Sequence, residues 1–157
     1  MFCQRFVNSL RLHFTMIYFH TQDIKFSLKK KAFLKKWIIS IIGKKKQKTG
    51  ELNFIFCSDE FLLTINKQYL NHDTYTDIIT FDYSQKNMQV NISGDIYISI
   101  DRVKENALKY SKSFEDELHR VLIHGTLHLL GYKDKTKIAK AEMTKQEDLC
   151  LAILKKL

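Results

Sequence analysis

Residues 124–134 read His124-Gly-Thr-Leu-His-Leu-Leu-Gly-Tyr-Lys-Asp134 and place two histidines four residues apart. His124 and His128 would lie on the same face of a helix, because four residues nearly complete a turn of about 3.6 residues. Gly131 follows where a helix that ends and doubles back needs a positive φ angle. Asp134 lies just beyond, so the returning chain could offer a carboxylate oxygen to the two imidazoles. The pattern predicts a metal site with three protein ligands and an open coordination position.

The segment that carries the histidines is apolar nearly all round its last three turns, which predicts a buried helix. Imidazoles on a buried helix need partners for their nitrogens. One alternative is that His124 and His128 are core histidines bonded to backbone carbonyls. Gly131 and Asp134 favour a metal ion instead, because they bring a third ligand to the same point.

Glu117 lies seven residues before His124 and therefore on the same helical face, two turns away. It could orient a metal ligand through a hydrogen bond. It could equally pair with Arg120 or Lys112.

Three protein ligands and an open position are typical of catalytic zinc sites, where the ion lowers the pKa of a coordinated water. Hydrolysis is therefore the expected chemistry. Zinc proteases with an H-E-x-x-H motif use the glutamate after the first histidine as general base. Gly125 occupies that position here, which makes peptide hydrolysis the weaker hypothesis and leaves a phosphodiester, its charge countered by lysines, as the better one.

Strand and helix patterns succeed each other along the chain. Alternating aromatic and β-branched residues predict strands at 17–23, 51–57, 77–83 and 90–99, and apolar residues at helical spacing predict helices at 32–42, 60–69, 102–110, 114–130 and 138–157. Ser58 or Asp59 would cap the second helix, Gly43 would end the first, and Gly94 suggests a bulge or a close backbone approach. Residues 71–76 are expected to form a loop and residues 85–89 a turn. The order predicts an α+β fold with a mixed sheet of about four strands, a buried ligand-bearing helix and several surrounding helices.

The composition is that of one ordinary globular domain, with 157 residues of which 45% are hydrophobic and 27% charged. No apolar run approaches the roughly 18 residues of a membrane helix. Cys3, Cys57 and Cys150 match no zinc-finger spacing, so we expect ordinary thiols in a reducing cytoplasm. The first clean strand pattern opens at Met16. Residues 1–15 are therefore expected to be an N-terminal extension to a domain spanning residues 16–157.

The formal net charge of +9 and the pI of about 9.4 favour a partner with a phosphate backbone. Residues 29–48 contain many lysines and no acidic residue, around an amphipathic helix. The alternative is a solvated basic face over an apolar stripe that contacts no RNA.

The histidine stretch, preceded by Phe114-x-x-Glu117-Leu118, resembles the YbeY family of bacterial metal-dependent endoribonucleases. Three upstream blocks are similar as well: Leu63-x-x-Asn66-x-x-Tyr69, Asp73-x-x-Thr76-Asp-Ile-Ile-Thr-Phe81 and Gly94-Asp-Ile-Tyr-Ile-Ser99. The resemblance covers about residues 16–155. It implies a ligand-bearing helix surrounded by a four-stranded sheet and further helices, and an activity in small-subunit rRNA maturation.

The chain departs from the family pattern at two places. The family has a third histidine ten residues after the first, where this chain has Asp134, and Lys133 replaces the usual aspartate before it. A carboxylate is a competent zinc ligand, so the resemblance still implies a metal site. The family also usually has an arginine where this chain has Leu70. Either Lys67, His72 or another cation takes its place against phosphate, or the nuclease step is weak.

The leading hypothesis is a single-strand endoribonuclease with one Zn²⁺, or another divalent transition metal, bound by His124, His128 and Asp134. It would act on rRNA in the small ribosomal subunit, in maturation and quality control, with no DNA or membrane partner. We expect the RNA-binding residues to include Lys30, Lys35, Lys67 and His72. One rival is a metalloprotease-like hydrolase, which Gly125 opposes. The other is a non-catalytic RNA-binding or ribosome-binding factor with a structural metal.

Overall fold

The computed structural model describes residues 16–84 and 91–157. The expected N-terminal extension (1–15), with Cys3, and the expected turn at 85–89 lie outside these residues, as does Val90. The described elements are β1 (Met16–Thr21), α1 (Lys31–Lys44), β2 (Lys48–Cys57), α2 (Asp59–Leu70), β3 (Ile78–Asp82), β4 (Asn91–Ser99), α3 (Ile100–Lys109), α4 (Phe114–Leu129) and α5 (Lys137–Leu154).

The described strands form one four-stranded sheet in the order β1-β2-β4-β3. β1 pairs with β2 and β2 with β4 in parallel, whereas β3 pairs with β4 in antiparallel fashion. The predicted α+β fold with a mixed sheet is therefore confirmed. In the central strand β4, buried residues alternate with half-buried ones, and the last four residues of β2 are all buried. This pattern is expected for strands with helices on both faces of the sheet.

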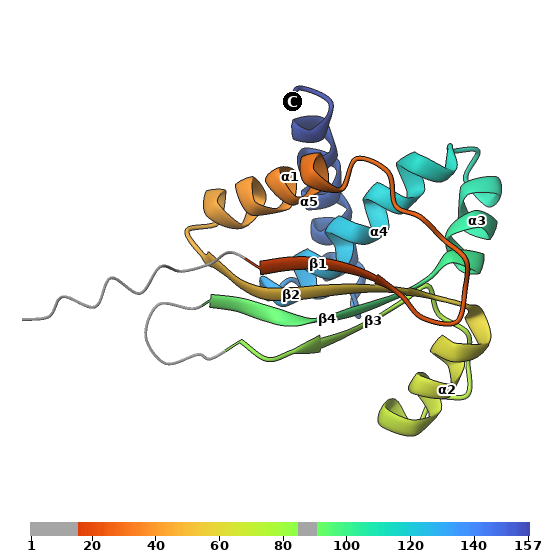
Figure 1. Ribbon diagram of the computed structural model, residues 1–157. Helices are drawn as coiled ribbons and strands as arrows, with labels where there is room; N and C mark the ends of the chain where they lie inside the picture. Colours follow the sequence, from red (N-terminus) through yellow and green to blue (C-terminus); the bar gives the residue numbers. More distant parts are fainter. Residues whose placement is uncertain (1–15, 85–90) are drawn as a thin grey trace, which may run out of the picture.

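Helices cover the two faces of the sheet unequally: α1, α3, α4 and α5 lie on one side and α2 lies on the other (Figure 1). The main hydrophobic core lies between the sheet and the larger helical layer, with Trp37 of α1, Phe54 of β2 and Leu122 of α4 completely buried. A smaller cluster under α2 contains Leu62 and Ile79. α4 packs against β3 and β4 and is flanked by α3 and α5, so the histidine-bearing helix is central, as predicted.

Four of the described helices have a serine or threonine as their N-cap residue. Ser58, Ser99, Ser113 and Thr136 each accept a hydrogen bond from the backbone N–H three residues later, at the starts of α2, α3, α4 and α5. These caps satisfy backbone donors that the first helical turn leaves free. The predicted cap by Ser58 is confirmed.

Gly94 allows a close backbone approach, one of its two predicted roles. A Cβ atom there would lie 2.3 Å from the carbonyl oxygen of Phe81 and 2.9 Å from Cδ2 of Leu129. The irregular register falls on the neighbouring strand, between Thr49 and Leu52. The absence of a side chain at Gly94 therefore lets both β3 and the end of α4 lie close to β4.

The predicted end of the first helix is wrong by a short distance. α1 continues through Gly43 to Lys44, and the left-handed backbone conformation falls on Lys46, with φ of 59°. The carbonyl of Gly43 accepts a hydrogen bond from the N–H of Lys46, which closes the turn. Within the described residues, no helix combines the length and apolar character that crossing a bilayer requires.

Candidate metal centre

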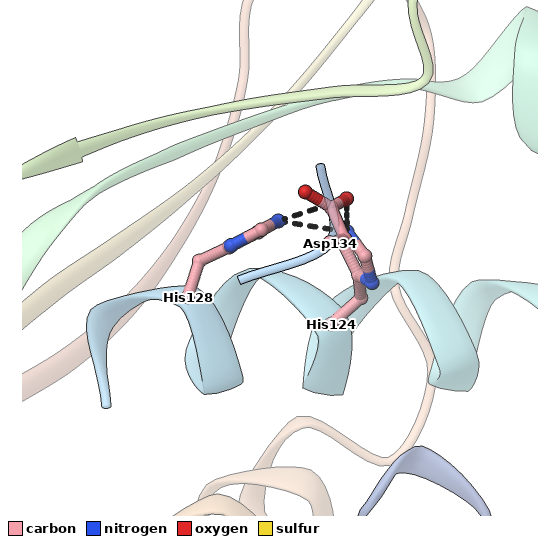
Figure 2. A group of neighbouring side chains, drawn as sticks. All are labelled: His124, His128 and Asp134. Atoms are coloured by element: carbon pink, nitrogen blue, oxygen red, sulfur yellow. Dashed lines mark hydrogen bonds and ion pairs between the residues drawn. The ribbon is translucent and has the colours of Figure 1, made fainter. Parts of the chain in front are cut away.

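His124, His128 and Asp134 converge on one point at the C-terminal end of α4 (Figure 2). The two Nε2 atoms lie 2.9 Å apart, and each lies 3.5 Å from Oδ2 of Asp134. Donor atoms at bonds of about 2.0–2.2 Å from one tetrahedral zinc ion are separated by about 3.3–3.5 Å. The group could therefore hold a metal ion with little rearrangement.

The other ring nitrogen of each histidine has a fixed acceptor. Nδ1 of His124 lies 2.6 Å from Oε1 of Glu147, and Nδ1 of His128 lies 3.0 Å from the carbonyl oxygen of Tyr132. A carboxylate and a carbonyl only accept hydrogen bonds, so both Nδ1 atoms donate, and the lone pairs of both Nε2 atoms face Asp134. The two Nε2 atoms and Oδ2 of Asp134 are thus three acceptors that face one another. One proton can be shared by two of them, whereas a metal ion can bind all three.

Gly131 performs the predicted reversal of the chain. Its φ angle is +94°, a conformation in which side chains are strained. Its N–H donates to the carbonyl of His128 at 2.9 Å, and the N–H of Tyr132 donates to the carbonyl of Leu127 at 3.0 Å. This turn places the carbonyl of Tyr132 against His128 and Asp134 beside both imidazoles.

Glu147, on α5, is a site residue that the sequence interpretation missed. It is buried, and its second oxygen accepts a hydrogen bond from Nη1 of Arg120 at 2.8 Å, while Nη2 of Arg120 bonds Asp148 at 2.8 Å. The hydrogen bond from Arg120 fixes the position of this carboxylate against His124. A signal was present, because Glu147 shares the spacing of the buried residues Met143, Cys150 and Leu154 on one face of α5.

Glu117 does not take the orienting role that its spacing suggested. Among the described residues, no hydrogen bond or ion pair joins it to His124, Arg120 or Lys112. Seven residues of helix span about 10.5 Å along the axis, which is too far for a glutamate to reach. Glu117 is buried, and burial raises the pKa of its carboxyl group.

Position 125 faces the sheet and not the metal group. A Cβ on Gly125 would lie 2.7 Å from Cδ1 of Ile78 and 2.7 Å from Cγ2 of Ile96. Glycine itself supplies no general base, and a larger residue here would overlap the sheet, so the H-E-x-x-H arrangement of the protease alternative has no counterpart at this position.

The pKa values of the two histidines move in opposite directions. Burial lowers the pKa of His124, but the hydrogen bond and charge of Glu147, with Asp77 and Asp134 nearby, raise it overall above its ordinary value. Burial and the neighbouring His124 lower the pKa of His128. The surroundings therefore favour a positive charge at His124 and the neutral form of His128.

A cleft of about 500 Å³ opens beside the metal group, a size typical of ligand sites. One wall comes from the end of α4 and the turn after it, and the other from the α2–β3 connection and β3. Its lining includes His128, Asp134, Lys133, Lys135, Leu70, His72, Tyr75, Thr80 and Asp82.

The four predicted RNA-binding residues lie in different places. His72 lines the cleft. Lys67 forms an ion pair with Asp73 at 2.7 Å, and Lys30 pairs with Glu115 at 3.2 Å. Lys35 lies over the ring of Tyr18, 5.7 Å from its centroid. The structure brings only His72 of the four into the lining of this cleft.

Leu70, the position of the family arginine, lines the cleft too. Apart from the proposed ligand His128, the basic residues in the described cleft lining are His72, Lys133 and Lys135. Lys133 and Lys135 were not among the predicted RNA-binding residues, although they flank Asp134 in the sequence.

Comparisons with known proteins identify a family for this chain. A family model described as Endoribonuclease YbeY matches residues 16–155. A protein of that name from Cytophaga hutchinsonii is 50% identical over 139 residues, covering 88% of this chain and 96% of the relative. Another from Bacteroides thetaiotaomicron is 43% identical and covers 86% and 96%.

A solved structure is similar as well. The solution structure of a Thermotoga maritima protein has 28% sequence identity and a TM-score of 0.59, and the match covers 90% of this chain and 93% of the other. Sequence and fold lead to the same assignment: the chain belongs to the YbeY family of endoribonucleases.

Proposed function

We propose that this endoribonuclease cuts single-stranded RNA at a zinc site held by His124, His128 and Asp134, and that it acts in the maturation and quality control of small-subunit rRNA. One observation carries the assignment of the site. The lone pairs of two Nε2 atoms and a carboxylate oxygen converge within 3.5 Å, while Glu147 and Tyr132 occupy the remaining ring nitrogens.

The donor set supports zinc as the ion. Two imidazoles and a carboxylate are zinc ligands, and three protein ligands leave a position open for catalysis. When bound, the ion supplies Lewis acidity and lowers the pKa of water towards neutrality. Other divalent transition metals share a preference for imidazole, so they are the natural competitors.

The protein's own groups hold the ligands in place. Glu147, held in place by Arg120, fixes the tautomer of His124, and the carbonyl of Tyr132 fixes that of His128. Gly131 lets the chain return so that Asp134 completes the group. The cleft beside the site gives an RNA segment access to it.

The basic character of the chain supports an rRNA partner. A net charge of +9 favours a polyanion, and the lysines around α1 are among the groups that could contact phosphates on a ribosomal particle. We place the protein in the cytoplasm, because small ribosomal subunits mature there. Family membership supports ribonuclease activity over the two rival hypotheses, a protease and a non-catalytic binding factor.

The test measures metal content and cleavage of a small-subunit rRNA fragment by the purified wild type, His124→Ala and His20→Ala. His20 is an exposed histidine that bonds Asn53 at 3.2 Å, outside the cleft, and serves as the matched control. We expect the wild type and His20→Ala to retain metal and cut RNA, and His124→Ala to lose both. Unchanged metal and cleavage in His124→Ala would overturn the site, and casein turnover without RNA cleavage would overturn the function.

A further inference from the structure

Two lysines lie beside the metal group without a partner among the described residues. Lys133 and Lys135 flank Asp134, line the 500 Å³ cleft with it and are exposed. Within residues 16–84 and 91–157, neither forms a hydrogen bond or an ion pair. Lys30 and Lys67, by contrast, are each engaged by a carboxylate. Two unpaired cations thus lie next to the proposed reaction centre.

The local field reinforces these two charges. α5 begins at Lys137 and has no acidic residue in its first turn, so the positive end of its dipole is not neutralised there. The carboxylates in the described cleft lining are Asp82 and Asp134. Since Asp134 is committed to the ion in the proposed site, Asp82 is the acidic group left to oppose an anionic ligand.

The opposite wall carries an exposed aromatic ring. Tyr75 is 48% exposed, and the guanidinium carbon of Arg102 lies 4.9 Å from its ring centroid. Its hydroxyl lies 3.3 Å from a carboxylate oxygen of Glu60. Arg102 is itself bound to Asp59 at 2.6 Å, so the ring packs against an anchored side chain. A fixed, exposed ring is a stacking platform for an unpaired base.

We propose that single-stranded RNA crosses the cleft with its phosphates on Lys133 and Lys135 and a base stacked on Tyr75. The inference rests on the proposed ribonuclease function and adds how the substrate is held. The two lysines bring the backbone beside His128 and Asp134, while stacking on Tyr75 requires a base that is free of its complementary strand. The arrangement therefore selects single-stranded over double-stranded RNA.

The experiment uses metal-loaded protein and a fluorescein-labelled, single-stranded RNA 12-mer. Stopped-flow anisotropy reads binding before cleavage, across a series of salt concentrations, and steady-state assays give kcat and KM. The variants are Lys133→Gln/Lys135→Gln, Tyr75→Leu and Tyr75→Phe. Lys104→Gln/Lys156→Gln is the charge-matched control, because both control lysines are exposed and neither lines the cleft.

We expect the Lys133→Gln/Lys135→Gln variant to bind at least about tenfold more weakly and to lose about 0.7 per lysine from the slope of log affinity against log salt. Tyr75→Leu should weaken binding by about 5-fold to 100-fold with an unchanged slope, and Tyr75→Phe should keep wild-type binding. Both weakened variants should raise KM more than they lower kcat, with metal content unchanged. The control pair should behave as the wild type.

The outcomes separate this inference from the function beneath it. Wild-type affinity and slope in the Lys133→Gln/Lys135→Gln variant, or an equal loss in the control pair, would overturn the inference while leaving RNA cleavage in place. A metal-loaded wild type that binds the 12-mer but never cuts any RNA would contradict the proposed function. The salt slopes would still decide whether these lysines hold the phosphates.

Discussion

Oε1 of Glu147 lies 2.6 Å from Nδ1 of His124, although the two residues are 23 positions apart and belong to different helices. Arg120, one turn before His124 on α4, holds the second oxygen of the same carboxylate. The packing of α5 against α4 therefore sets the orientation of a proposed metal ligand, and the metal site depends on a contact between helices as well as on the local H-x-x-x-H pattern.

Replacing Glu147 with glutamine should lower zinc affinity by about 10-fold to 100-fold, the usual cost of changing a group that supports a metal ligand. The amide has a similar shape and one acceptor oxygen, but it cannot accept from both His124 and Arg120 as the two carboxylate oxygens do. Competition with a chromogenic chelator measures the change. Glu142→Gln, an exposed change on the same helix, is the control. Equal affinity in Glu147→Gln and wild type would show that α5 does not tune the site.

Gly125→Ala should destabilise the protein because its new methyl group would overlap Ile78 and Ile96. Overpacking typically lowers the free energy of unfolding by about 1–3 kcal/mol. The better helix propensity of alanine offsets up to about 1 kcal/mol of this loss. Gly43→Ala in α1 meets no atom within 4 Å, so it should raise the free energy of unfolding by up to about 1 kcal/mol. Urea unfolding with a chelator present measures both. A Gly125→Ala protein as stable as Gly43→Ala would contradict the tight packing of α4 on the sheet.

The two buried thiols should be unreactive in the folded protein. Burial raises the pKa of Cys57 to about 12 and that of Cys150 to about 11. The thiolate is the reactive form, so in a Cys3→Ser background Ellman's reagent at pH 8 should label neither until denaturant is added. Immediate reaction of one native thiol would contradict its burial.

The same shifts have a consequence for stability. The folded state keeps thiol protons that the unfolded state releases above its pKa of about 9. This contribution to stability is complete below pH 9 and is lost as the pH rises towards the folded values. Replacing Cys150 with alanine should therefore reduce the loss of stability between pH 9 and pH 11, as measured by urea unfolding.

The parts of the site that sequence could predict are the local ones. His124, His128, Gly131 and Asp134 lie within eleven residues, and helical geometry with one left-handed turn is enough to bring them together. Glu147 could not be assigned from spacing, because its contact with His124 depends on how α5 packs. The position of Glu147 among apolar residues on one face of α5 indicates a buried carboxylate, but it does not indicate which residue that carboxylate contacts.

The fold shows the same division. Alternation and helical spacing predicted the elements and the α+β class, and Ser58 was correctly placed as a cap. The strand order β1-β2-β4-β3 was not predicted, since pairing is a long-range property. The spacing of Glu117 gave its helical face but not its contacts, and no hydrogen bond joins it to His124 within the described residues. The end of α1 was misplaced at Gly43 because a glycine can also continue a helix.

Zinc binding and RNA cleavage by Asp134→Ala test the metal site most directly, since Asp134 is where this chain departs from the family pattern. The wild type should retain one zinc ion per chain after gel filtration and cut RNA. Asp134→Ala should bind zinc more than about 100-fold more weakly, because losing a ligand costs more than losing a group behind one, and should not cut RNA. Zinc affinity and cleavage equal to those of the wild type in Asp134→Ala would contradict the three-ligand site.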